Sequence, residues 1–509
     1  MRTRVAKASV LLALATILAC SSEPPTDPPL QAEPDPPAAW IWQDGPLGQQ
    51  PWEAESFAAA QRRDCPVLLY LAAPGAEGLF AEDNAWLADQ LVLIRVDPFR
   101  RPDIARRYAT GGWPALVLLD PKGRIIAQGT DIPPPQTTLF IRRLVDHYGS
   151  QRDLIERKLR RPPPRAGAPY SVEVDPVYRA IAATFDSLHG GFGQGPKFPE
   201  TEVLRFLLAY HARYPDRGAW KMARRSLDAL LASPMLDTEA GGISAFSFTP
   251  DWRAPVREKE GADQAGLTMA LLAAVPYGGE AYGQAARALM DYAAEDLFDD
   301  ELGVFKGRQL QRPDGTWWTD PAVYADRNAL LIRACLRQAA HSRTPGPIRL
   351  ARQAAAFVIE QGLDHRGAVY HYWRDGTGFI PGLLEDQVLT AAALLDLYDL
   401  SGEDRFREKA AAIMGFMEKN LLETSLPAFF DRPPIYGLES HLERPYFPYR
   451  SGPLPAANPV AAQLYLRLGQ IQRAGRILGA GPLDGNPGRA SSTHARMLLE
   501  YAADQTNQP

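Results

Sequence analysis

The sequence predicts an α/β domain followed by a larger all-α domain. Short apolar runs of strand length, rich in Val, Ile and Leu, stand between residues 66 and 130. From about residue 170 onward, apolar residues recur every three to four positions, which is the period of an amphipathic helix. A chain of 509 residues is long enough for two or three domains, each with its own core.

The composition excludes some classes of partner. It is 46% hydrophobic and 23% charged, as in an ordinary globular protein. The formal net charge of -5 argues against nucleic acid as a partner, because no basic surplus is present to neutralise phosphates. Of the 3 cysteines, Cys20 lies near the N-terminus, and Cys65 and Cys335 are far apart, so a disulfide framework is not expected.

The N-terminus predicts secretion. Residues 1–19 combine a basic start with a short apolar run, as in a signal peptide. The sequence Ala19-Cys20 resembles a bacterial lipobox, in which Cys20 becomes the lipidated first residue; the alternative is a plain signal peptide that contains a cysteine. Residues 20–45 form a Pro-rich tether, which stays extended. We therefore expect a lipoprotein anchored to a membrane of the bacterial cell envelope, periplasmic or surface-facing.

Residues 46–150 are predicted to form the α/β domain. Helices are expected at 52–63 and 79–90, and strands at 67–71, 91–97, 115–119 and 124–128. Strand, helix, strand, helix and hairpin is the order of a thioredoxin-like fold, and Trp113-Pro114 matches its cis-proline position. Where that fold carries Cys-x-x-Cys, residues 72–78 hold no cysteine. Dithiol exchange needs two thiols, so a thiol-disulfide oxidoreductase is not expected.

Residues 165–505 are predicted to form the all-α domain, and its helix starts repeat. Asp263, Asp326, Asp386 and Asn458 each stand at the start of an apolar helix, at intervals of 63, 60 and 72 residues. A period near sixty suits helical hairpins that stack into a closed or solenoid array. Such polar residues either cap their own helices or, in a toroid, ring one mouth.

Several segments together resemble the spermatogenesis-associated protein 20-like family. They are residues 96–108 with 111–114, 185–199, 252–267 and 384–398. The resemblance implies a thioredoxin-like domain followed by an (α/α) toroid of the six-hairpin glycosidase-like type. This chain departs from the family in lacking both cysteines of the first domain. It also has Val256-Arg257 in place of His-Phe, and Asp263-Gln264 in place of Asp-Asn.

Carboxylates at a toroid mouth indicate work on sugars, because glycoside hydrolysis uses a pair of them. The catalytic candidates are Glu258, Asp263, Asp326 and Asp386, with Glu385 beside them. The candidates for substrate binding are Phe192, Lys197, Trp252, Tyr372 and Trp373. Trp317, Trp318, Tyr370 and Phe198 are further aromatic residues that could line the same mouth.

Other chemistries find less support. Epimerases on similar helical barrels use histidine as a proton carrier, and His189, His365 and His371 are available for that role. No ligand spacing indicates a zinc site, no Gly-rich loop follows a strand, and no Gly-x-Ser-x-Gly occurs. We expect no cofactor and no metal.

The expected function is binding or processing of a carbohydrate, by a hydrolase or an epimerase. The alternative is a non-catalytic binding or scaffold protein at the cell envelope. Geometry separates the two. If two of Glu258, Asp263, Asp326 and Asp386 face each other within about 5 to 10 Å, hydrolysis stays open. If they cap their own helices, the binding protein is favoured.

Overall fold

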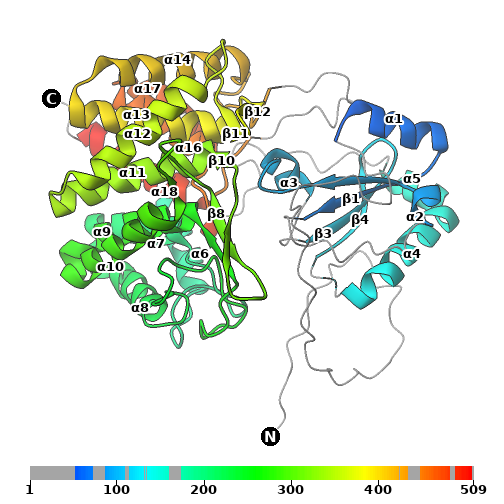
Figure 1. The fold of residues 1–509 in the computed structure, drawn as a ribbon, viewed down its shortest axis with the longest axis horizontal. Helices are drawn as coiled ribbons and strands as arrows, with labels where there is room; N and C mark the ends of the chain where they lie inside the picture. Colours follow the sequence, from blue (N-terminus) through cyan, green and yellow to red (C-terminus); the bar gives the residue numbers. More distant parts are fainter. Residues whose placement is uncertain are drawn as a thin grey trace, which may run out of the picture. The chain divides into compact units, whose positions relative to one another are not determined.

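The computed structural model describes residues 52–72, 86–108, 114–130, 132, 134–159, 173–423, 425–433, 447–481 and 488–506. The chain divides near residue 165 into two compact units, which we call the N-terminal unit and the toroid (Figure 1). The predicted signal peptide, Cys20, the tether, the turn at 73–78 and residues 111–113 lie outside the described residues. No helix among the described residues has both the length and the apolar character needed to cross a membrane.

The N-terminal unit has the predicted thioredoxin-like arrangement. Its sheet has the order β2-β1-β3-β4, with β1 parallel to β2 and antiparallel to β3. The strands are β1 Val67–Leu71, β2 Val92–Val96, β3 Ala115–Leu119 and β4 Ile125–Thr130. The helices are α1 Ala54–Arg63, α2 Leu87–Gln90, α3 Pro102–Tyr108, α4 Pro134–Ser150 and α5 Arg152–Leu159.

The central strands are apolar throughout because helices cover both faces of the sheet. Alternate residues of β1 belong to different cores: Val67, Leu69 and Leu71 pack with α1 and α3, while Leu68 and Tyr70 pack with α2, α4 and α5. The predicted strands therefore match the structure to within one or two residues. Cys65 and Cys335 are buried and form no disulfide.

The toroid is a closed ring of helical hairpins, as predicted. The inner helices are α7 Thr201–Arg213, α9 Gly261–Gly278, α11 Ala325–Ser342, α13 Leu384–Ser401, α16 Ala457–Arg467 and α18 Ser492–Thr506. The outer helices are α6 Val174–Ala183, α8 Ala219–Leu231, α10 Glu280–Tyr292, α12 Gly346–Gln361, α14 Asp404–Asn420 and α17 Ile471–Ala480. Each inner helix packs on the next, and α18 packs on α7, which closes the ring.

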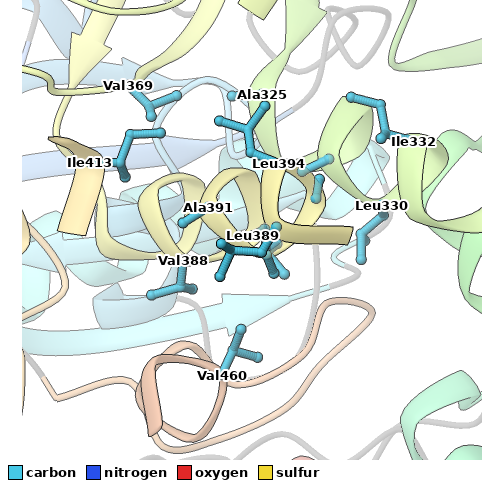
Figure 2. Packing of buried hydrophobic residues seen from close by; sticks show 14 of the residues in the cluster. Ala325, Leu330, Ile332, Val369, Val388, Leu389, Ala391, Leu394, Ile413 and Val460 are labelled. Carbon is cyan, nitrogen blue, oxygen red and sulfur yellow. The ribbon is translucent and has the colours of Figure 1, made fainter. Parts of the chain in front are cut away.

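Burial explains why the inner helices carry apolar residues on every side. Residues 384–395 of α13 are all buried. Figure 2 shows Val388, Leu389, Ala391 and Leu394 of α13 leaving the helix in different directions toward α11, α14 and α16. A helix that is apolar all round is one that neighbours surround, whereas an outer helix needs only one apolar face.

A short loop motif recurs before successive inner helices. An apolar residue and an acidic residue, Asp in four copies and Glu423 in the fifth, are followed, after a turn that usually contains Gly, by a second apolar residue that pairs with the first. The paired residues are Phe185–Phe192, Leu236–Ile243, Phe298–Phe305, Leu363–Val369 and Leu422–Phe429. In the first four loops the Asp carboxylate accepts hydrogen bonds from backbone N–H groups two to four residues later.

Buried amides of the inner helices hold these loops. Gln264 accepts a hydrogen bond from the backbone N–H of Ile243 and donates one to its carbonyl, both at 2.8 Å. Asn328, Gln387 and Asn458 hold Phe305, Val369 and Phe429 in the same way. A buried backbone group without a partner is costly. The amides in the repeated helix starts therefore have a structural role.

Candidate functional site

The candidate site is a cluster of acids at the mouth formed by the N-termini of the inner helices. Asp263, Asp326 and Asp386 stand in the first turns of α9, α11 and α13, one or two residues before the amides that hold the loops. Successive helix residues are about 100° apart, so these carboxylates leave the helix in other directions than the amides. Glu258 lies on β5 Glu258–Glu260, which leads directly into α9.

The first half of the cluster joins two carboxylates to a histidine. His371 lies on β11 Tyr370–Arg374, and its Nδ1 is 3.1 and 2.9 Å from the two carboxylate oxygens of Asp386. An oxygen of Asp326 lies within 4.8 Å of both partners. The three residues are at most 1% exposed. Two of the predicted carboxylates therefore face each other, from different inner helices.

The second half of the cluster is organised by two arginines. Arg308, on β8 Arg308–Gln311, lies 2.8 Å from Glu258 Oε1 through Nη1 and 3.2 Å from Asp320 Oδ2 through Nε. Arg327 forms an ion pair with Asp326, and its Nε lies 3.9 Å from Glu260 Oε2. Arg327 therefore connects the two halves.

Burial raises the pKa of three of these acids. It raises the pKa of Asp263 to about 7, with a further contribution from the charge of Glu258. Burial and Glu258 also raise the pKa of Glu260 well above its ordinary value. Burial raises the pKa of Asp386 to about 6, although His371 opposes this.

The histidine is charged at neutral pH. Burial alone would lower the pKa of His371, but the adjacent Asp386 carboxylate outweighs burial and raises this pKa to about 9. Proton donors and acceptors therefore coexist near pH 7, and such shifted groups gather at functional sites.

Asp326, His371 and Asp386 are also the described residues whose ligand atoms could hold a metal ion. Their spacing in the sequence did not indicate this, because they come from two helices and a strand. The guanidinium of Arg327 and the imidazolium of His371 supply positive charge to the two carboxylates. A metal ion at this position would replace the proton of His371, because a ligating histidine is neutral.

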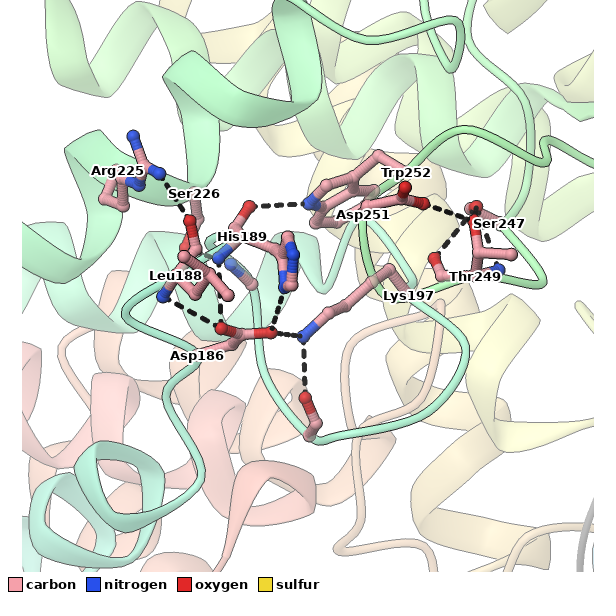
Figure 3. A network of polar contacts seen from close by, with 12 residues as sticks. Asp186, Leu188, His189, Lys197, Arg225, Ser226, Ser247, Thr249, Asp251 and Trp252 are labelled. Atoms are coloured by element: carbon pink, nitrogen blue, oxygen red, sulfur yellow. Dashed lines mark hydrogen bonds and ion pairs between the residues drawn. The ribbon is translucent and has the colours of Figure 1, made fainter. Parts of the chain in front are cut away.

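Three of the predicted binding residues have structural roles. Phe192 belongs to the apolar core. The Lys197 ammonium is 0% exposed and donates hydrogen bonds to Asp186 Oδ2 at 2.9 Å and to the Gly193 carbonyl at 2.6 Å (Figure 3). Trp252 is buried and donates from Nε1 to the His189 carbonyl at 3.0 Å. Each of the three is at most 2% exposed and is held by partners in its own loop or core.

The aromatic residues of β11 divide between core and site. Trp373 is buried and donates from Nε1 to the Gln361 carbonyl at 2.8 Å. Tyr372 is half-buried, stacks on Phe379 at 4.9 Å between ring centroids, and lies 6.0 Å from the ring of Tyr324. Because Tyr324 also contacts His371 at 5.7 Å, Tyr372 is the predicted binding residue that stays beside the cluster.

The remaining candidates are spread around the toroid. Glu385 is buried beside Asp386, and its charge contributes to the raised pKa of Asp386. Trp317, Trp318 and Tyr370 are half-buried, and Phe198 is exposed. Of the three histidines, His189 contacts Asp186 and His365 lies exposed in a turn, so only His371 joins the acids. Sequence reasoning missed Glu260, Arg308, Arg327, Asp320 and Tyr324.

A surface depression lies elsewhere, at the opposite ends of the inner helices. Its volume is about 860 Å³, and Gln470, Arg473 and Tyr501 contribute to its lining. The lining, which consists of described residues, includes no carboxylate. The mouth therefore remains the place where acid–base chemistry is available.

Comparison with known proteins supports the predicted resemblance. No family model matches the chain. Human spermatogenesis-associated protein 20 is 25% identical over 312 residues, covering 53% of this chain and 39% of that protein. An uncharacterized Caenorhabditis elegans protein is 27% identical over 259 residues, covering 44% of this chain and 36% of that protein. The chain thus spans about two fifths of the length of the curated relatives it matches.

Solved structures support the fold of the toroid. Cellobiose 2-epimerase from Bacillus thermoamylovorans superposes with a TM-score of 0.52 at 10% identity, covering 63% of this chain and 95% of the epimerase. A D-mannose isomerase superposes with a TM-score of 0.50 at 12% identity, covering 65% of this chain and 96% of the isomerase. Together with the sequence matches, they show that the chain is similar to spermatogenesis-associated protein 20 over about half of its length and that its toroid has the six-hairpin glycosidase-like fold, behind a thioredoxin-like unit.

Proposed function

We propose that the mouth of the toroid binds a saccharide and processes it by proton transfer. The observation that carries this proposal is the buried His371–Asp386 pair with Asp326 beside it. The named activities of two structural neighbours, a cellobiose 2-epimerase and a D-mannose isomerase, support a sugar as the ligand.

The protonation states suit acid–base catalysis. Near pH 7 the His371 imidazolium can donate a proton, and the Asp386 carboxylate can accept one. One oxygen of Asp326 and one of Asp386 lie no more than 4.8 Å apart, so the two carboxylates approach each other more closely than the ~6.5–9.5 Å of inverting glycosidases. This favours direct proton transfer or double displacement over attack by a water molecule held between two carboxylates.

The alternative is a non-catalytic binding or scaffold protein. The observation that favours it is burial, because Asp326, His371 and Asp386 are at most 1% exposed. Under the enzyme proposal, a covering segment must move before a sugar reaches these side chains. Under the alternative, the cluster only stabilises the mouth.

The test is sugar turnover by the mature protein and matched variants. Gluco- and manno-configured mono- and oligosaccharides are incubated in D2O, and NMR follows deuterium uptake and new products. We expect His371→Gln and Asp386→Asn to lower turnover by roughly 10²- to 10⁴-fold. His341→Gln is the control, since His341 contacts Glu280 near the other end of α11. Equal turnover in all variants, or none in the wild type, would reject the enzyme in favour of the alternative.

We also propose that the protein is anchored at the bacterial cell envelope through a lipid on Cys20. The basic and apolar N-terminus followed by Ala19-Cys20 and a Pro-rich tether supports this. A Cys20→Ala variant should lose incorporation of labelled palmitate and leave the membrane fraction. Retention in that fraction without label would contradict the lipid anchor.

A further inference from the structure

Three phenylalanines form an exposed aromatic surface on the toroid, which we call the phenylalanine platform. Phe198 and Phe248 are 47% and 61% exposed. Phe246 lies between them, with ring centroids 5.2 Å from Phe198 and 4.9 Å from Phe248. Exposed aromatic rings that touch one another offer a flat apolar face on which a ligand can stack.

Backbone hydrogen bonds fix the platform on a small ladder of three segments. The Lys197 and Ser247 backbones exchange hydrogen bonds at 2.9 and 2.8 Å, and Phe248 N–H donates to the Ala254 carbonyl at 2.8 Å. Successive residues of an extended segment face opposite sides. Lys197 and Ser247, both 0% exposed, take the inner side, and the phenylalanines next to them take the outer side.

The same ladder continues to the acid cluster. The Val256 N–H donates to the Phe246 carbonyl at 2.8 Å, and the Ala245 N–H donates to the Glu258 carbonyl at 2.9 Å. The Glu258 carboxylate then contacts Arg308 at 2.8 Å. The platform and the mouth cluster are therefore joined by one stretch of backbone, so a ligand that is long enough could contact both.

The size of the platform argues against a protein as its occupant. An aromatic side chain offers ~150–250 Å², so the two exposed rings provide on the order of 200 Å². A stable protein interface needs about 800 Å² on each partner. Sugar rings suit an area of this size, because the C–H face of a pyranose can lie on an aromatic ring.

The charge of the neighbouring cluster narrows the class of sugar. Among the described residues of this cluster, seven carboxylates stand beside three cationic side chains. The acids are Glu258, Glu260, Asp263, Asp320, Asp326, Glu385 and Asp386, and the cations are Arg308, Arg327 and His371. Even with some acids protonated, this surplus repels uronic acids and other anionic sugars.

We propose that the phenylalanine platform is a second binding site for the distal rings of a neutral oligosaccharide whose reacting end lies at the mouth. This inference rests on the proposed function. It implies that chain length is recognised: a long saccharide contacts both places, whereas a disaccharide contacts only the mouth.

The test is calorimetric titration with cellohexaose, mannohexaose and maltohexaose and with the corresponding disaccharides. We expect Phe248→Ala and Phe198→Ala each to weaken hexasaccharide binding roughly 2- to 10-fold, with disaccharide turnover within twofold of wild type. Leu400→Ala is the matched control, because Leu400 is 51% exposed near the other end of α13.

The outcomes separate this inference from the proposed function. If the Phe variants bind hexasaccharides as wild type does and turnover persists, the platform is wrong and the proposed function stands. If the wild type binds no saccharide, both fail. If the Phe variants instead change the oligomeric state in light scattering, or association with vesicles of phosphatidylethanolamine and phosphatidylglycerol, the occupant is a second copy or a membrane and the inference is overturned.

Discussion

Two groups of buried charges in the toroid differ in how completely they are paired. In the first group, which we call the lysine cradles, Lys197 meets Asp186 and Lys259 meets Asp237, each at 2.9 Å. Each ammonium also donates to a glycine carbonyl at 2.6 Å. Burial alone would raise the pKa of both aspartates. The lysine and the backbone N–H groups outweigh burial and hold both pKa values below the ordinary value of an aspartate.

The mouth cluster is the opposite case. Among the described residues its acids outnumber its cations, and burial raises the pKa of Asp263, Glu260 and Asp386. Each lysine cradle joins one carboxylate to one ammonium and to backbone groups of a single turn, across 11 or 22 residues of sequence, whereas the cluster draws its charges from several strands and helices. Buried charges that are matched one to one in this way belong to the scaffold. Acids kept partly protonated are the ones available for chemistry.

The largest effect on stability is expected from breaking a lysine cradle. Lys197→Met should lower the free energy of unfolding of the toroid by about 3–5 kcal/mol, because it leaves the Asp186 carboxylate buried without its charged partner. Urea unfolding followed by tryptophan fluorescence measures this change.

The double variant Lys197→Met, Asp186→Asn provides the control. It removes both charges, so it should recover part of the lost stability. A loss below about 1 kcal/mol in the single variant would contradict the structural role of Lys197 and reopen its assignment to substrate binding.

Much of the fold could be predicted from local pattern. The strands of the N-terminal unit are short apolar runs rich in Leu, Val and Ile, and the helix starts at Asp263, Asp326 and Asp386 show as polar residues before an apolar run. The repeated loop motif is also present in the sequence, at Asp186, Asp237, Asp299 and Asp364, but an apolar residue followed by Asp is too short a pattern to predict a shared turn.

The errors concern residues whose partners are distant or fold back. Lys197 looked like a ligand-binding residue, since nothing in its motif shows that its ammonium returns to Asp186, 11 residues earlier. His371 could not be told from other histidines, because Asp386 is 15 residues away on a different element. Arg308 and Arg327 were missed since only the folded chain shows which buried acids they pair with.

A smaller effect, and one that depends on pH, is expected at the mouth. Folding raises the pKa of Asp263 from 3.8 to about 7. The folded state therefore binds more protons than the unfolded state in this range, so the stability that Asp263 contributes is present at low pH and is lost as the pH rises through 7. As the pH rises from 5 to 8, the free energy of unfolding of the Asp263→Asn variant should increase by about 1–3 kcal/mol relative to that of the wild type.

Other groups titrate in the same range, so the difference between the two proteins is the quantity to measure. Burial lowers the pKa of His494 to about 4. The stability that neutral His494 contributes is therefore lost as the pH falls below about 6.5, which is the opposite pH dependence to that of Asp263. His494 is present in both proteins, so its effect cancels. Parallel stability curves from pH 5 to 8 would show that Asp263 is ionised throughout, and the contrast with the lysine cradles would fail at this residue.

The smallest effect is expected where the repeated loop pairs its Asp with an exposed cation. Arg366 is bound to Asp364 at 2.7 Å but its side chain is 53% exposed, against 0% for Lys197. Asp364 also accepts backbone N–H groups of Arg366 and Ala368, which Arg366→Ala retains. The expected loss of unfolding free energy is about 0.2–1 kcal/mol in urea unfolding, because water replaces the guanidinium.

Removing the side chain of Lys306, which is 16% exposed, should cost an amount of stability between the losses at Arg366 and at Lys197. An equal loss of unfolding free energy at Arg366 and at Lys197 would mean that every copy of the loop needs its cation, however exposed that cation is. Pairing in a turn, rather than desolvation, would then be what separates the lysine cradles from the mouth cluster.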